Sequence, residues 1–259
     1  RVNMLGNIFK ARKFITGFSG SAGTAVITKT EARLWTDGRY FIQAAAQLEG
    51  TTVELMKMGE PGVPELNAYI EEVLKEGETL GFDGRVVSVG EGEGYAAIAR
   101  KKNAKVNYQV DLIDEIWEDR PVLSEEPAFD LDVKYAGENV ASKLARIREE
   151  MKEAGTNVHV VSTIDDICWT LNIRGNDIDF FPLVLSYGII TMDSFELYID
   201  ERKLDDKLKA KLAKDGVNLH PYNDIYEDVK KFDSDVVAMI DPGKLNYALF
   251  NIFLKMLRQ

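Results

Sequence analysis

Two short segments of the sequence concentrate polar residues that could bind a ligand. The first is residues 36–40, Thr-Asp-Gly-Arg-Tyr, which lie where a predicted strand is followed by a predicted helix. A carboxylate at such a junction can cap the helix, and an arginine can pair with a carboxylate through two parallel hydrogen bonds. Asp37 and Arg39 therefore have a structural interpretation as a cap and an ion pair. The alternative is that Arg39 faces a substrate.

The second segment is residues 172–177, Asn-Ile-Arg-Gly-Asn-Asp, which follow a predicted turn at residues 164–171. Amide and carboxylate side chains in a loop hydrogen-bond nearby backbone groups, and loops also carry binding residues. Asn172, Arg174 and Asp177 could order one another across a turn, or they could face a ligand. The sequence leaves both interpretations open, so these three residues and Arg39 are the candidate substrate-facing residues.

No set of residues has the spacing of a metal site or of a nucleophile with its base. Metal sites need several His, Cys, Asp or Glu ligands close together, whereas His159 and His220 are far apart and no His-Glu-x-x-His is present. Cys168 lies in an apolar stretch, which predicts a buried, unreactive thiol. Ser21 lacks the Gly-x-Ser-x-Gly elbow of serine hydrolases. We therefore predict no catalytic residue and no metal ligand in this chain.

The composition is that of a globular protein with an acidic surface. Of the 259 residues 45% are hydrophobic, and 43 acidic against 32 basic side chains give a formal net charge of −11. Phosphate backbones bind basic surfaces, so nucleic acid is not an expected partner. A single cysteine cannot form an internal disulfide, which favours a reducing, cytoplasmic location. No apolar run approaches the roughly 20 residues of a membrane helix, so we expect no membrane contact.

Predicted strands and helices alternate along the chain, which favours an α/β fold with mixed sheets over an all-α or all-β fold. Strands are expected at residues 24–28, 33–36, 51–56, 79–82, 105–108, 158–162, 183–191, 195–199, 217–220 and 236–240. Helices are expected at residues 40–48, 64–75, 94–102, 139–153, 201–214, 225–232 and 245–257, and a turn is expected at residues 164–171. Residues 121–127 are polar and contain Pro121 and Pro127, a composition that is typical of a linker between domains. We expect a first domain at 1–122, a linker at 123–137 and a second domain at 138–259.

Residues 17–23, which contain Gly17, Gly20 and Gly23 and are called here the glycine-rich corner, begin a set of motifs that resembles a known family. Residues 18–24 read Phe-Ser-Gly-Ser-Ala-Gly-Thr, and residues 35–44 read Trp-Thr-Asp-Gly-Arg-Tyr-Phe-Ile-Gln-Ala. Ile-Trp-Glu-Asp-Arg-Pro stands at 116–121, and Asp-Ile-Cys-Trp-Thr-Leu-Asn-Ile-Arg-Gly-Asn-Asp at 166–177. This combination resembles the N-terminal part of cytosolic-type aminopeptidase P, the Xaa-Pro aminopeptidases of the creatinase and prolidase superfamily.

The resemblance implies a fold and a function. Members of that family carry two N-terminal ribonuclease-H-like α/β domains and a third, pita-bread catalytic domain, which holds two divalent metal ions, usually manganese. They release the N-terminal residue from peptides that have proline in second position. The resemblance places the catalytic domain beyond this chain. The fragment alone should then be inactive, should support substrate access and homodimerisation, and should have its own C-terminal catalytic domain and a proline-containing peptide as partners.

Two other interpretations fit the same sequence. A creatinase- or prolidase-like hydrolase shares the architecture, and the chain could also be a free-standing binding or dimerisation module. One departure from the family pattern concerns the start of the chain. Members begin with a helix, a strand and a loop before the equivalent of residues 10–14, whereas here Leu5 leads directly to Gly6. Residues could therefore be missing between Leu5 and Gly6.

Overall fold

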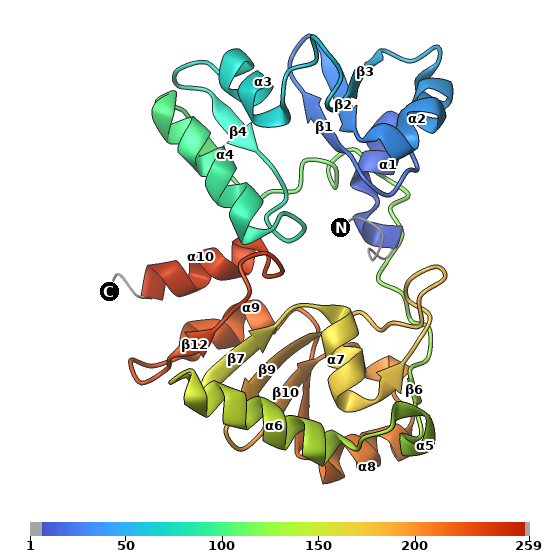
Figure 1. The fold of residues 1–259 in the computed structure, drawn as a ribbon, viewed down its shortest axis with the longest axis vertical. Coiled ribbons are helices and arrows are strands. Elements are labelled where there is room, and N and C mark those ends of the chain that lie inside the picture. Colours follow the sequence, from blue (N-terminus) through green and yellow to red (C-terminus); the bar gives the residue numbers. More distant parts are fainter. Residues whose placement is uncertain (1–6, 257–259) are drawn as a thin grey trace. The chain divides into compact units, whose positions relative to one another are not determined.

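The computed structural model describes residues 7–256 and divides into two compact units. Unit 1 comprises Arg1–Asp83 and Glu91–Val122, and unit 2 comprises Gly84–Gly90 and Leu123–Gln259. Each unit is an α/β assembly, so the predicted fold class is confirmed (Figure 1). Leu5 and Gly6, where missing residues are suspected, lie outside the described residues.

Unit 1 contains a three-stranded sheet and a separate strand pair (Figure 1). In the sheet, β2 pairs antiparallel with β1 and parallel with β3, and β4 pairs parallel with β5. Its helices and strands are η2 (Asn7–Phe9), α1 (Ala11–Thr16), β1 (Thr24–Ile27), β2 (Ala32–Thr36), η3 (Gly38–Tyr40), α2 (Phe41–Leu48), β3 (Val53–Lys57), α3 (Leu66–Val73), β4 (Thr79–Gly81), α4 (Val89–Lys101), whose first two residues belong to unit 2, and β5 (Lys105–Asn107).

The glycine-rich corner of unit 1 is a tightly packed structural element. The ring of Phe18 is fully buried beneath it, and a Cβ built on Gly20 would lie 2.2 Å from that ring. A Cβ on Gly23 would lie 2.8 Å from the carbonyl oxygen of Trp35. The Arg12 guanidinium donates hydrogen bonds to the carbonyl oxygens of Gly20 and Gly23. Glycine is therefore required at both positions, because any side chain would collide with buried atoms.

Unit 2 is built on a five-stranded mixed sheet with the strand order β11-β10-β9-β7-β12. The central β9 is antiparallel to both neighbours, and the two edge strands are parallel to theirs. Its helices and strands are β6 (Phe129–Asp130), α5 (Val133–Ala136), α6 (Val140–Glu153), β7 (Val158–Val161), α7 (Ile164–Leu171), β8 (Ile173–Arg174), β9 (Tyr187–Thr191), β10 (Phe195–Tyr198), η4 (Glu201–Lys203), α8 (Asp206–Lys214), β11 (Val217–His220), α9 (Ile225–Asp228), η5 (Val229–Lys231), β12 (Ala238–Met239) and α10 (Tyr247–Met256).

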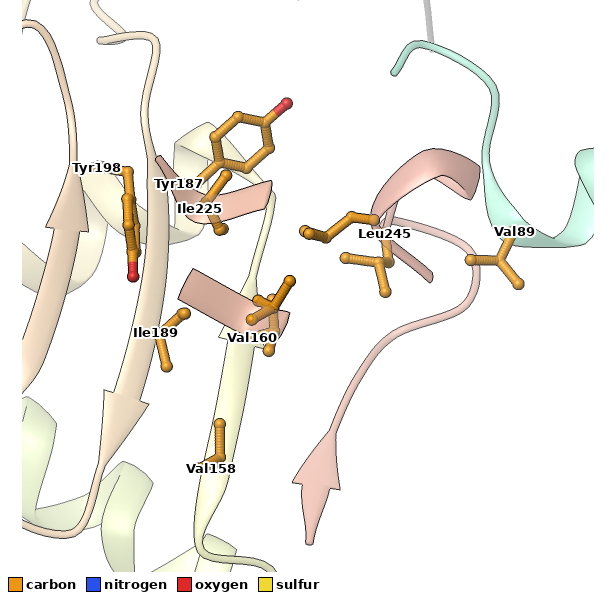
Figure 2. Close-up of a cluster of buried hydrophobic side chains, with 10 residues drawn as sticks. Val89, Val158, Val160, Tyr187, Ile189, Tyr198, Ile225 and Leu245 are labelled. Atoms are coloured by element: carbon orange, nitrogen blue, oxygen red, sulfur yellow. The ribbon is translucent and has the colours of Figure 1, made fainter. Parts of the chain in front are cut away.

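One apolar cluster joins the sheet of unit 2 to its covering segments (Figure 2). Side chains from β7, β9 and β10 meet Leu245, which precedes α10, and Val89, which begins α4. The backbone of the 84–90 segment adds to this packing, because Val89 donates to the carbonyl oxygen of Leu245 at 3.0 Å and Tyr247 donates to that of Val87 at 2.8 Å. These contacts explain why residues 84–90 belong to unit 2.

Several elements differ from the sequence-based prediction of helices. The turn expected at 164–171 is the helix α7, and the helix expected at 225–232 is divided into α9 and η5. The helix expected at 94–102 begins at Val89, because the burial of Val89 outweighs the low helix propensity of Gly90 and Gly94. The helix expected at 201–214 is two elements, η4 and α8. Asp205 separates them, and its carboxylate accepts a hydrogen bond from the Leu208 amide at 2.7 Å, which caps a new helix.

The stretch 123–137, predicted to be a linker, contains β6 and α5 and belongs to unit 2. Strand β6 pairs with β8 across the Phe129–Arg174 and Asp130–Ile173 positions. The predicted domain boundaries, with the first domain ending at residue 122 and the second beginning after residue 137, stay a prediction. Within residues 7–256 no helix is both long and apolar enough to cross a membrane.

Candidate functional site

The Arg39 segment of unit 1 is a capping arrangement. The Asp37 carboxylate accepts hydrogen bonds from the backbone amide of Arg39 at 3.1 Å, from its Nε at 2.8 Å and from its Nη2 at 2.8 Å. These hydrogen bonds from Arg39 lower the pKa of Asp37 to about 2. The interpretation of Asp37 as a cap and Arg39 as its ion-pair partner is confirmed. The Arg39 side chain is nevertheless 69% exposed, so it can also reach a ligand.

Unit 2 contains a second copy of this arrangement, at Asp200 and Arg202. Asp200 caps η4, accepting from the Arg202 amide at 3.0 Å and from Nε and Nη2 of the guanidinium. The Arg202 side chain is 67% exposed, nearly as much as that of Arg39. The same Asp-x-Arg cap therefore occurs in each of the two units. It also supplies a matched control for experiments on Arg39.

Side chains of β2, η3 and α2 bind the serine-containing loop of the glycine-rich corner. Ser19 accepts hydrogen bonds from the side-chain amides of Gln43 at 3.1 Å and Gln47 at 2.8 Å. Ser21 shares a hydrogen bond with the Tyr40 hydroxyl, and Thr36 donates to the carbonyl oxygen of Ala22 at 2.6 Å. The hydroxyl groups of this loop thus stabilise a turn.

Asn172 is fully buried at the C-terminal end of α7. Its backbone adopts the left-handed conformation, with φ 52°, which asparagine tolerates better than most residues. Its Nδ2 donates to the carbonyl oxygen of Glu138 at 2.9 Å, and its Oδ1 accepts from Lys143 Nζ at 2.6 Å. Both ends of the amide are therefore occupied by internal contacts.

Lys143 is a buried residue that the sequence analysis missed. Its side chain extends from α6, and its ammonium donates to Asn172 Oδ1 and to the carbonyl oxygen of Trp169, both at 2.6 Å. The ammonium also lies 4.3 Å from the centre of the Trp169 ring, a cation–π distance. Burial lowers the pKa of Lys143. The available signal was its spacing, three residues after Val140 and four before Ile147, which places it on the apolar stripe of its helix.

Glu138 begins the turn that leads into α6. Its carboxylate accepts from Arg146 Nε at 3.1 Å and Nη2 at 2.7 Å, and from Ser142 Oγ at 2.6 Å. The hydrogen bonds from Arg146 and then Ser142 lower the pKa of Glu138 to about 2. Because the backbone carbonyl of Glu138 binds Asn172, this network connects the start of α6 to the end of α7.

Arg174 lies in β8 and its guanidinium turns back toward the end of α7. Nη1 donates to the carbonyl oxygens of Cys168 at 2.7 Å and Ile173 at 2.8 Å. A cation at the C-terminal end of a helix stabilises the unpaired carbonyl groups there. The next residue, Gly175, has no room for a side chain, because a Cβ would lie 2.7 Å from Val184.

Asp177 and Lys203 form an ion pair in which both side chains are 1% exposed. Asp177 Oδ2 accepts from Lys203 Nζ and from the Leu185 amide, both at 2.6 Å. Asp177 Oδ1 is buried and has no hydrogen-bond partner among the described residues. The pair fixes the segment between β8 and β9 to η4, which lies 26 residues further along the chain.

The four candidate residues thus fall into two places. Asn172, Arg174 and Asp177 lie in one segment of unit 2, where their polar atoms bind backbone groups and lysines. Arg39 lies in unit 1. Their role toward a substrate stays a prediction.

The remaining reactive residue types have structural contacts. Cys168 is buried, and burial raises the pKa of its thiol to about 11, so the predicted buried thiol is confirmed. His159 lies 3.1 Å from the carbonyl oxygen of Met239, and His220 Nε2 lies 2.7 Å from the Glu196 carboxylate. In the part of the chain that the structure describes, no three His, Cys, Asp or Glu side chains gather in a way that could hold a metal ion.

The fold is a pair of α/β domains. The polar residues of the candidate site bind backbone groups and side chains of the same chain. The chain belongs to the family of creatinase/prolidase N-terminal domains, whose family models match residues 10–118 and 119–258. Aminopeptidase P2 of Arabidopsis thaliana is 39% identical over 249 residues, covering 95% of this chain. Xaa-Pro aminopeptidase app-1 of Caenorhabditis elegans is 36% identical over 249 residues, covering 93% of this chain. The resemblance inferred from the motifs is therefore confirmed.

A solved structure supports the same relation. The crystal structure of X-prolyl aminopeptidase from Caenorhabditis elegans, described as a cytosolic enzyme with a di-nuclear active site, matches 96% of this chain with a TM-score of 0.90 and 35% identity. The chain spans 35% of the Arabidopsis protein and 42% of the crystallised chain.

The Glu138 network predicts a specific pH dependence. In the folded protein the hydrogen bonds from Arg146 and Ser142 lower the pKa of the Glu138 carboxyl from an ordinary value near 4.5 to about 2. Its contribution to stability is therefore present above pH 4.5 and is lost as the pH falls from 4.5 toward 2. Carbon-13 NMR of the Glu138 carboxyl should show it mostly ionised at pH 3, and Arg146→Gln should raise its midpoint toward 4.5. A midpoint above 4 in the unaltered protein would contradict the network.

Proposed function

We propose that this chain forms the two N-terminal domains of a metal-dependent Xaa-Pro aminopeptidase, which releases the N-terminal residue from peptides with proline in second position. The observation that carries the proposal is the extent of the match. Family models cover residues 10–258, and relatives along 93–95% of the chain are named aminopeptidase P or Xaa-Pro aminopeptidase.

In this proposal the chemistry belongs to the rest of the full-length protein. The described residues supply no cluster of metal ligands, and Cys168 is buried with a raised pKa. They therefore do not fit a two-metal centre. We propose that two divalent ions, manganese by resemblance, are held by a C-terminal catalytic domain, and that the two units alone are inactive. The di-nuclear active site described for the Caenorhabditis elegans enzyme agrees with this proposal.

The two units would then control the access of substrate to the active site and support the assembly of the full-length protein into a dimer. We propose that they restrict the catalytic cleft to short proline-containing peptides and support a homodimer of the full-length protein in the cytoplasm. The net charge of −11 gives no support for nucleic-acid binding. The description of the Caenorhabditis elegans enzyme as cytosolic supports the location.

A comparison of the 259-residue chain with the full-length protein tests this function. Both would be incubated with manganese and an Xaa-Pro-containing tripeptide, and release of the first residue would be followed by mass spectrometry. We expect turnover by the full-length protein alone. Turnover by the 259-residue chain would overturn the assignment of catalysis to the other part, and its absence from the full-length protein would overturn the proposed activity.

The four candidate residues are proposed to border the substrate cleft, Arg39 by direct contact. In the full-length enzyme Arg39→Ala should raise KM for peptides roughly tenfold with kcat nearly unchanged, because a charge-assisted hydrogen bond contributes about 1.5–3 kcal/mol. Arg174→Ala should raise KM in the same way if its guanidinium contacts the peptide.

The matched control is Arg202→Ala, which removes a nearly equally exposed arginine from the same Asp-x-Arg cap. Arg202 also pairs with Glu125, from Nη1 to Oε1 at 2.6 Å, so its variant loses one further ion pair. It should leave KM unchanged. Equal KM values for the Arg39 and Arg202 variants, with similar losses of stability, would leave Arg39 with a capping role only. Asn172 and Asp177 are buried, so their variants should lower stability before they change KM.

A further inference from the structure

The segment between β8 and β9 carries two exposed aromatic residues on a loop whose two ends are held in place. We call residues 178–182, Ile-Asp-Phe-Phe-Pro, the aromatic loop. Phe180 is fully exposed and Phe181 is 43% exposed. Two consecutive exposed aromatic residues are unusual on a protein surface, and exposed aromatic residues are enriched at interaction sites, where they supply much of the binding energy.

The backbone of Phe180 has a conformation that its own side chain disfavours. Its φ is 68°, in the left-handed region, where a bulky residue is an outlier and glycine is the usual choice. Strained positions of this kind persist where surrounding contacts enforce them, and they cluster at functional sites. Here the conformation directs a large apolar ring into solvent, so stability of the unit alone does not account for the residue.

The ends of the loop are fixed by contacts already described for Asp177. The buried pair with Lys203 holds the residue before the loop, and Ile178 is itself buried. The Phe181 amide donates to the carbonyl oxygen of Ile178 at 3.1 Å, and the Asp177 amide donates to that of Leu183 at 3.1 Å. The loop is thus organised before any partner binds, which reduces the entropy lost on association.

We propose that the aromatic loop is the contact through which unit 2 binds the C-terminal part of the full-length protein, with Phe180 inserted into an apolar pocket there. This inference rests on the proposed function. The chain spans only 35–42% of the length of its relatives, so most of the polypeptide is available as an intramolecular partner. A covalently connected partner is present at a high effective concentration, which favours it over any separate molecule.

The first test is Phe180→Gly in both the full-length enzyme and the 259-residue chain. Glycine tolerates φ 68°, so the variant removes the ring and the strain together. The Tm of the 259-residue chain should stay the same or rise, whereas that of the full-length enzyme should fall by about 2 °C or more. The control, Tyr135→Ala, removes another exposed aromatic ring of unit 2 and should lower neither Tm. The same change in both proteins would overturn the proposal.

The second test measures coverage directly. A thiol introduced by Phe180→Cys should react with a maleimide at least tenfold more slowly in the full-length enzyme than in the 259-residue chain, as read by mass spectrometry of the labelled peptide. Tyr135→Cys should react at equal rates in both. Equal rates at position 180 would overturn the proposal, as would a raised KM for peptides with unchanged Tm, which would assign the loop to substrate.

Two further outcomes are also informative. Halving of the molar mass of the full-length enzyme by Phe180→Gly would assign the loop to a second copy and overturn the proposal. Neither the Tm nor the labelling rate depends on turnover. Protection of position 180 in a full-length protein without peptidase activity would therefore support the loop contact while the proposed function fails.

Discussion

The burial of two lysine ammonium groups is the constraint on which unit 2 depends. An ammonium removed from water loses several kcal/mol of hydration unless other groups replace it. Lys203 regains this energy from Asp177, and Lys143 from Asn172 Oδ1 and the carbonyl oxygen of Trp169. Both lysines bind the segment that follows α7. That segment can take no other position without leaving a charge unpaired in the interior.

This constraint explains why a polar sequence lies within the structure. Asn172 and Asp177 are the acceptors for the buried lysines, and Arg174 binds the carbonyl oxygens at the end of α7. The result is a defined path for the chain from α7 through β8 to β9. The buried pair at Asp177 immediately precedes the aromatic loop, so the same interaction that replaces hydration in the interior also fixes the start of an exposed surface.

Local patterns in the sequence predicted what local contacts determine. The cap at Asp37 was predictable because its donor is the amide two residues later, and Cys168 was predictably buried because its neighbours are apolar. The lysines were not predicted, since Lys143 and Lys203 meet partners 29 and 26 residues away. Strand β8 was not predicted for the same reason, because it pairs with β6, which lies more than 40 residues earlier in the chain. The start of α8 had a local signal, because Asp205 is a typical N-cap residue. It was not recognised because the surrounding residues 201–214 are continuously charged and were predicted as one helix.

The most direct test of the central claim is a double-mutant cycle on Asp177 and Lys203, read from the opening free energies of β9 amides by hydrogen exchange. Lys203→Met should cost about 3–5 kcal/mol, because it leaves a buried carboxylate unpaired. Adding Asp177→Asn, which keeps an acceptor for the Leu185 amide and removes the charge, should recover most of that loss. Additive losses in the double variant would show that the two charges are not coupled and would contradict the account.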